Sequence, residues 1–191
     1  MSPGCLRCAE PMVSERGICG RCLTSPPAFG HCLALFHYTD VVQWMIQQFK
    51  FHQGLLYGRW LAQCMVESLP LAERFCRPDV IVPVPLHASR MRQRGYNQAG
   101  ELAKYLAKEL GLKLDMTACE RVLKTKEQTA LSAQKRRRNL RNAFIVKQDF
   151  SGANVVVIDD VITTSATANA MAHALKKAGA EQVFVWAVAR S

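Results

Sequence analysis

The sequence predicts an α/β protein built on a mostly parallel sheet. Two observations support this class. Short runs of β-branched residues alternate with helical patterns, and the run from Val155 to Ile158 is apolar at every position. Unbroken apolar runs are typical of strands that helices cover on both faces, as in parallel sheets. The 191 residues suffice for one such domain and a small additional module.

The segment after this apolar run carries the most specific pattern in the chain. Asp159 and Asp160 follow the strand directly, and a short hydroxyl-rich stretch follows them. Apolar residues at helical spacing come next, and Gly179 ends that pattern. The predicted order is strand, acidic pair, hydroxyl-rich loop and helix. A loop that enters a helix points free backbone N–H groups at its ligand, which suits a phosphate.

The acidic pair and the loop together predict a sugar-phosphate site. Ionised carboxylates accept hydrogen bonds from vicinal hydroxyls or from water on Mg²⁺, while hydroxyl side chains donate to phosphate oxygens. A ligand with a sugar diol and a 5′-phosphate would satisfy both groups. The candidate binding residues are Asp159, Asp160, Thr163, Thr164, Ser165, Ala166 and Thr167.

The chain begins with two cysteine pairs, Cys5-x-x-Cys8 and Cys19-x-x-Cys22. This paired spacing is typical of a structural Zn²⁺ site, and four thiolates leave no open position for catalysis. Redox-active thiols and cysteines buried without a metal are the alternatives. A redox pair usually occurs singly beside a βαβ pattern, which is not the case here. We expect residues 1–30 to form a zinc module and its linker.

The elements between this module and the acidic pair fall into two groups. A strand near residues 32–38 and two helices occupy residues 31–76 and lead into the core. Residues 77–191 form the predicted nucleotide-binding domain. Its strands are expected near residues 79–85, 143–146, 155–159 and 182–189, with one helix that begins after Asn97 and ends at Gly111.

Positive charge is concentrated in one part of the chain. The net charge is +10, and residues 86–142 contain 14 Lys or Arg against 5 Asp or Glu, a net of +9. This excess suits pyrophosphate, a nucleotide or nucleic acid, although a solvated surface explains the arginines of residues 90–94 equally well. We expect those arginines to share one side of an extended loop. The candidate basic residues are Arg90, Arg92, Arg94, Lys124, Lys126, Arg136, Arg137 and Arg138.

No apolar run in the sequence approaches the roughly 20 residues that cross a bilayer. The first residues also lack the basic and apolar regions of a signal peptide. We therefore expect a cytoplasmic protein that does not insert into membranes.

These motifs together resemble the competence protein F (ComF) family along essentially the whole chain. The stretch from Val155 to Thr167 also resembles the phosphoribosyl-pyrophosphate (PRPP) signature of type I phosphoribosyltransferases, although many members have Gly at the position of Ser165. The remaining shared motifs are Cys5-x-x-Cys8, Cys19-x-x-Cys22, Pro83-Val84-Pro85-Leu86, Arg90, Arg94-Gly95-Tyr96-Asn97-Gln98, Thr125-x-x-Gln128-x-x-Leu131-Ser132, Arg136-x-x-Asn139 and Ala143-Phe144.

The resemblance implies a type I phosphoribosyltransferase-like domain with a small zinc-ribbon-like module at its N-terminus. In phosphoribosyltransferases the acidic pair contacts the ribose hydroxyls, and the loop holds the 5′-phosphate. ComF members are associated with natural transformation or with the use of DNA as a nutrient. The implied ligands are structural Zn²⁺ and PRPP with Mg²⁺, and other DNA-uptake proteins are candidate partners.

Two functions follow. The first is a DNA-uptake or DNA-utilisation accessory protein that binds PRPP and, through its basic segment, single-stranded DNA. The alternative is an active phosphoribosyltransferase that acts on a base or nucleotide without a direct DNA role. No residue stands out as a nucleophile or general base, so the sequence assigns no catalytic residue.

Overall fold

The structure is a computed structural model that describes residues 4–12, 17–51, 54–68, 77–122 and 143–191. Its centre is a five-stranded sheet with the order β1-β7-β6-β2-β3, in which every pairing is parallel. The predicted mostly parallel sheet is therefore confirmed. The strands are β1 (His31–His37), β2 (Val80–Pro83), β3 (Lys113–Leu114), β6 (Asn154–Ile162) and β7 (Gln182–Arg190).

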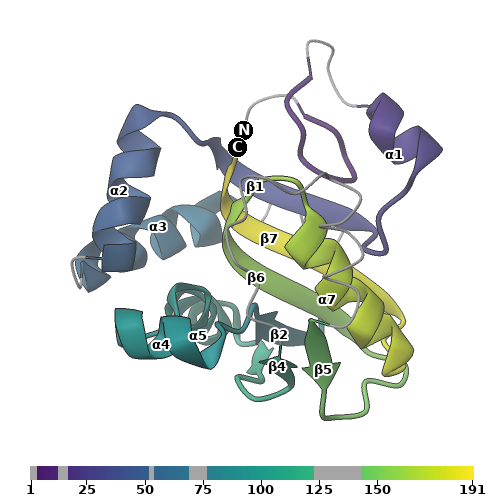
Figure 1. The fold of residues 1–191 in the computed structure, drawn as a ribbon. Helices are drawn as coiled ribbons and strands as arrows, with labels where there is room; N and C mark the ends of the chain where they lie inside the picture. Colours follow the sequence, from purple (N-terminus) through teal and green to yellow (C-terminus); the bar gives the residue numbers. More distant parts are fainter. Residues whose placement is uncertain (1–3, 13–16, 52–53, 69–76, 123–142) are drawn as a thin grey trace.

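The first strand of the chain belongs to this central sheet. β1 pairs along its length with β7, the last strand, and occupies one edge (Figure 1). Residues 31–37, which we grouped with the segment that leads into the core, therefore form part of the core sheet. This pairing brings the beginning of the chain beside its end.

Side chains that alternate along β6 fill two apolar layers. Val155 and Val157 pack on one face of the sheet, whereas Val156 and Ile158 pack on the other. All four are fully buried, and burial of one such side chain contributes about 1.5–3 kcal/mol. This two-sided burial explains why the sequence of β6 is apolar without interruption.

Helices cover both faces of the sheet (Figure 1). One face packs against α2 (Asp40–Phe51), α3 (Leu55–Ser68) and α5 (Gln98–Leu110). The other packs against α7 (Ala166–Lys177) and the N-terminal cysteine module, which contains the short helix α1 (Gly20–Thr24). Among the described residues, no helix has the length and apolar character needed to cross a membrane.

The strand predicted at residues 143–146 lies outside the central sheet. β5 (Phe144–Val146) pairs antiparallel with β4 (Cys119–Arg121) in a separate two-stranded sheet. Phe144 is buried, whereas Ile145 is 51% exposed. One-sided burial is typical of antiparallel strands with a solvated face, and a central parallel strand would be buried on both sides.

Candidate functional site

The acidic pair lies where β6 extends beyond its neighbour β2. β2 pairs with β6 only as far as Ile158, and the backbone N–H of Val84 adds a bond to the carbonyl of Ile158. From Asp159 to Ile162, β6 pairs with β7 alone. The predicted strand was therefore too short, because Asp159 and Asp160 belong to β6 rather than to a turn after it. Their position at the carboxyl end of a parallel sheet is where ligands bind in such folds.

Adjacent side chains of a strand point to opposite faces, so the two carboxylates have different surroundings. Asp160 lies on the face covered by α2, where its Oδ2 is 2.5 Å from the Nζ of Lys50. The Oδ1 of Asp160 accepts a hydrogen bond from the backbone N–H of Val161 at 2.8 Å. The exposed fractions of the Lys50 and Asp160 side chains are only 18% and 14%. Asp160 and Lys50 thus form a largely enclosed ion pair.

Asp159 faces the other side of the sheet and carries a perturbed carboxyl group. Burial, followed by the charge of Asp160, raises the pKa of Asp159 well above its usual value, and the charge of Lys50 only partly counteracts this. Its Oδ1 accepts a hydrogen bond from the backbone N–H of Asp160 at 2.9 Å. Perturbed carboxyl groups at the carboxyl edge of a sheet are typical of functional sites.

Two arginines share this electrostatic environment. Burial and the nearby charge of Arg90 lower the pKa of Arg121, whereas the charge of Asp159 raises it. Arg121 belongs to β4 and interacts both with Asp159 and with Arg90, which lies on the helix α4 (Ala88–Arg94). The guanidinium carbon of Arg121 also lies 5.7 Å from the centre of the Phe144 ring. An anionic ligand group would find complementary charge here.

The loop after β6 has the geometry of an anion site. Ser165 immediately precedes α7 and has a φ of +60°, in the left-handed region. It is the position where many phosphoribosyltransferases have Gly, and its conformation explains that preference. The side chain of Ser165 does not cap α7, and its Oγ is buried without a hydrogen-bond partner among the described residues. This hydroxyl and the backbone N–H groups of the first helical turn together suit a phosphate.

The remaining loop residues are less enclosed. Thr163 and Thr164 are exposed, and Ala166 and Thr167 are partly buried in the first turn of α7. The Oγ1 of Thr164 accepts a hydrogen bond from the backbone N–H of Ala166 at 3.4 Å. The structure therefore places all the predicted loop residues around the N-terminus of one helix, with the acidic pair on the adjoining strand.

The predicted arrangement of Arg90, Arg92 and Arg94 was wrong. These residues lie on the helix α4 (Ala88–Arg94), which His87 caps by accepting the N–H of Ser89. Residues two apart face different sides of a helix, so only Arg90 and Arg94 share a face. The helix was missed because its sequence has no apolar stripe. The other candidates, Lys124, Lys126, Arg136, Arg137 and Arg138, lie outside the described residues.

Sequence reasoning missed Lys50 and Arg121 as members of this site. Lys50 follows Phe49, a fully buried core residue, in the last turn of α2. Phe49 itself packs in the hydrophobic core. An isolated lysine gives no signal of its own in a sequence. Only the contact between α2 and the end of β6 identifies it.

The four predicted metal ligands come together at the N-terminus. Their sulfur atoms all lie within 4.8 Å of one another, and those of Cys8 and Cys19 are 3.7 Å apart. Tetrahedral Zn²⁺ with bonds of about 2.3 Å separates sulfurs by about 3.8 Å, so the cluster fits a metal of this type. Burial raises the pKa of Cys5, but backbone N–H groups, including that of Cys19, outweigh it and lower the pKa to about 7. None of the four cysteines forms a disulfide.

Comparison with known proteins identifies the class of this domain. Residues 91–190 match the phosphoribosyl transferase domain family. A purine phosphoribosyltransferase from Pyrococcus horikoshii superposes with a TM-score of 0.42 at 16% identity, over 84% of this chain and 86% of that one. The parallel sheet and the matched family together define a type I phosphoribosyltransferase-like domain.

Relatives that align over most of the chain identify the family more closely. Competence protein F of Haemophilus influenzae is 35% identical over 99% of this chain and 85% of its own length. The DNA utilization protein YhgH of Salmonella typhimurium is also 35% identical, over 98% and 84%. Competence protein ComFC of Streptococcus pneumoniae is 27% identical over 82% and 67%. The chain belongs to the competence protein F family.

Proposed function

We propose that this protein binds PRPP with Mg²⁺ at the carboxyl end of β6 and acts in DNA uptake or DNA utilisation in the cytoplasm. The main observation in support of PRPP as the ligand is the buried Oγ of Ser165, which has no hydrogen-bond partner among the described residues. It lies at the N-terminus of α7, in the loop that follows the two carboxylates. A phosphate at the helix and a diol at the carboxylates describe one end of PRPP. The names of the relatives support the cellular role.

Each part of the site has a role in this proposal. The 5′-phosphate accepts hydrogen bonds from the hydroxyls and backbone N–H groups of residues 163–167. The ribose hydroxyls donate to Asp159 and Asp160, which requires the Asp160 carboxylate to separate from Lys50. The released ammonium group of Lys50, together with Arg90 and Arg121, supplies positive charge for the pyrophosphate. Mg²⁺ would be held by the carboxylates of Asp159 and Asp160 through its water ligands, and it would neutralise part of the phosphate charge.

A PRPP titration by calorimetry in millimolar Mg²⁺ tests this proposal. Replacing Asp160 by Ala removes a charge-assisted hydrogen bond to the ribose, which contributes about 1.5–3 kcal/mol. We therefore expect Asp160→Ala to bind PRPP at least tenfold more weakly. Glu109→Ala is the matched control, because it removes one exposed carboxylate from α5. Wild-type protein that fails to bind PRPP, or an Asp160→Ala variant that binds as tightly, would refute the assignment.

Phosphoribosyl transfer is the alternative activity at the same site. In this reaction the bond from C1 of the ribose to pyrophosphate breaks, and a bond from C1 to the acceptor forms. Positioning and charge stabilisation would supply most of the catalysis. Pyrophosphate release from PRPP in the presence of bases or nucleotides tests it. Release that depends on the acceptor and is lost in Asp160→Ala favours the enzyme.

We also propose that the basic part of the chain binds single-stranded DNA, with other DNA-uptake proteins as partners. The net charge of +9 over residues 86–142 supports this. Single-strand binding has a logarithmic salt slope of about −0.7 per neutralised phosphate. Changing Arg136, Arg137 and Arg138 to Ala is therefore expected to weaken binding and to flatten the slope by roughly two units.

Two controls sharpen the DNA experiment. Changing the exposed residues Arg59, Lys147 and Lys177 to Ala removes the same amount of charge outside residues 86–142, and should change DNA affinity far less. The Asp160→Ala variant should bind DNA as the wild type does, since its role is in the sugar-phosphate site. A triple arginine variant with unchanged affinity and salt slope would remove the physical basis of this proposal.

A further inference from the structure

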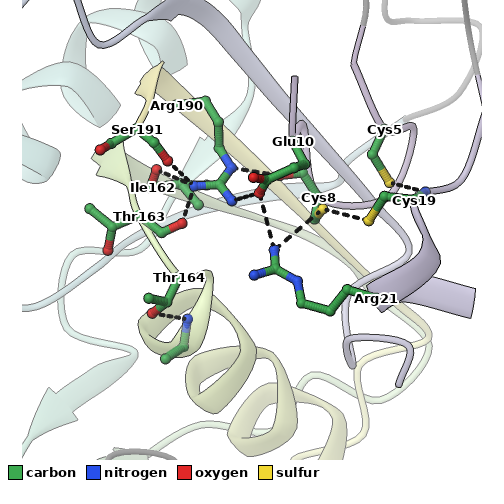
Figure 2. Close-up of polar contacts among 11 residues, drawn as sticks. Cys5, Cys8, Glu10, Cys19, Arg21, Ile162, Thr163, Thr164, Arg190 and Ser191 are labelled. Atoms are coloured by element: carbon green, nitrogen blue, oxygen red, sulfur yellow. Dashed lines mark hydrogen bonds and ion pairs between the residues drawn. The ribbon is translucent and has the colours of Figure 1, made fainter. Parts of the chain in front are cut away.

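Arg190 is the last residue of β7, and its side chain is almost completely buried at 3% exposure. A buried guanidinium is unfavourable unless its N–H groups have acceptors. Its Nε donates to the carbonyl of Cys8 at 3.2 Å, and its Nη1 donates to the carbonyl of Ile162 at 2.9 Å. Nη1 also donates to the carbonyls of Thr163 and Ser191, and Nη2 pairs with the carboxylate of Glu10 (Figure 2).

These acceptors come from two parts of the molecule with different roles. Cys8 and Glu10 belong to the cysteine module, and Cys8 contributes one of the four clustered sulfurs. Ile162 ends β6, and Thr163 begins the candidate phosphate loop. The side chain of Arg190 therefore connects the cysteine module to the phosphate loop, although Cys8 and Arg190 are 182 positions apart in the sequence.

The module side of this connection is itself fixed to the sulfur cluster. The Glu10 carboxylate that pairs with Arg190 also accepts a hydrogen bond from Arg21 at 3.3 Å. The same Arg21 nitrogen lies 3.7 Å from the Sγ of Cys8, and Figure 2 shows both arginines around Glu10. The position of Glu10 and of the Cys8 carbonyl thus depends on the order of the cysteine cluster.

The phosphate loop needs contacts that hold its backbone in place. Ser165 lies two residues after Thr163 and has a left-handed backbone conformation that is unfavourable for a residue other than Gly. A strained conformation persists only where its surroundings hold it. A second contact between the linker and the helix after the loop has the same effect, since the backbone N–H of Ala28 donates to Oδ1 of Asn169 at 2.7 Å.

We propose that Arg190 is a positioning residue through which the four-cysteine metal site holds the phosphate loop in its binding geometry. The part that concerns ligand affinity rests on the proposed PRPP site. Loss of the metal would release the Cys8 carbonyl and Glu10 from Arg190. The guanidinium would then lose acceptors on one side, and its hold on the Thr163 carbonyl would weaken. A role in packing alone would tie the stability of the fold to Arg190 without linking the metal to the loop.

Hydrogen exchange on the full-length protein tests this coupling without a ligand. Removal of the metal by a chelator should increase the exchange rates of the amides of residues 162–168 in the wild type at least tenfold, and returning Zn²⁺ should restore them. In Arg190→Lys the same amides should exchange rapidly with or without metal, because an ammonium cannot reach acceptors on both sides at once. Arg59→Lys is the matched control, since Arg59 is exposed on α3, which packs on the face of the sheet opposite the cysteine module and α7.

A second variant and a binding measurement complete the test. Glu10→Gln keeps a hydrogen-bond acceptor but loses the ion pair, and it replaces Arg190→Lys in the test if that variant does not fold. Metal-loaded Glu10→Gln should show faster loop exchange than the wild type, by a smaller factor than chelation produces. PRPP should bind at least tenfold more weakly to metal-loaded Arg190→Lys than to the wild type or to Arg59→Lys. Wild-type protein that binds no PRPP refutes the proposed site, while the exchange data still decide the coupling. Chelation that speeds exchange in the cysteine module but leaves residues 162–168 unchanged would overturn the proposal.

Discussion

The ion pair between Lys50 and Asp160 gives the most direct test of the site's electrostatics. Lys50→Met keeps much of the apolar stem of the side chain and removes its charge. Asp160 then has no cation at 2.5 Å and still has the carboxyl group of Asp159 next to it. We expect the variant to unfold at a lower temperature than the wild type, because a largely buried carboxylate has lost its counter-charge.

The exposure of the pair sets the size of this effect. A hydrogen bond to a charged group contributes about 1.5–3 kcal/mol. The two side chains remain 18% and 14% exposed, so solvent screens part of the interaction and the lower end of this range applies. A loss of about 1.5 kcal/mol corresponds to a decrease of roughly 3–6 °C in Tm for a domain of this size.

A double-mutant cycle separates the pair from other effects of the substitutions. Wild type, Lys50→Met, Asp160→Asn and the double variant are unfolded in urea at pH 7.5, and their m-values are compared to confirm a common mechanism. Lys50→Met should destabilise the wild type by about 1.5 kcal/mol more than it destabilises Asp160→Asn. Effects that add within about 0.5 kcal/mol would show that the two groups do not interact, and would refute the described ion pair.

Three further predictions concern Asp159, Ser165 and the cysteines. Because the pKa of Asp159 is raised in the folded protein, its ionisation destabilises the fold as pH rises above about 4. Asp159→Asn should therefore raise Tm at pH 8 and have little effect on Tm near pH 3.5. An equal gain in Tm at both pH values would contradict this. Ser165→Gly should relieve the left-handed backbone and stabilise the protein by about 0.5 kcal/mol in thermal unfolding, whereas Ser165→Ala keeps the Cβ and should not. Metal analysis of freshly purified, reduced protein should find about one Zn²⁺ per chain. The zinc should be lost in Cys22→Ser and retained in Cys64→Ser, because Cys64 lies outside the cluster. Wild-type protein without zinc would refute the site.

Several features of the fold follow from patterns that are local in the sequence. The apolar run at Val155 to Ile158 predicted a strand buried on both faces, and the helix that ends before Gly179 was also expected. Gly179 has a φ of +94° in the structure, as a helix-ending residue requires. The paired cysteine spacing predicted a sulfur cluster in the same way. A residue spacing or a turn residue is enough to predict each of these features, because each depends only on residues that are close together along the chain.

Other elements show where local patterns are insufficient. The helix α4 has no apolar stripe, so its arginines were assigned to an extended loop. The short strand β5 has a strand-like sequence, but the identity of its partner β4 is set by tertiary packing. Strand propensity predicts that a segment is extended and does not specify which sheet it joins.

The sequence alone determined the class of the sheet, the order of the acidic pair and phosphate loop, and the four candidate metal ligands. Tertiary structure decided which distant charges accompany them: Lys50 beside Asp160, Arg121 near Asp159, and Arg190 between Cys8 and Thr163. The physical reason is that each of these contacts joins side chains from elements far apart in the sequence. Their proximity depends on which helix covers which face of the sheet and on where β6 extends beyond β2, and neither is encoded in the spacing of residues along one element.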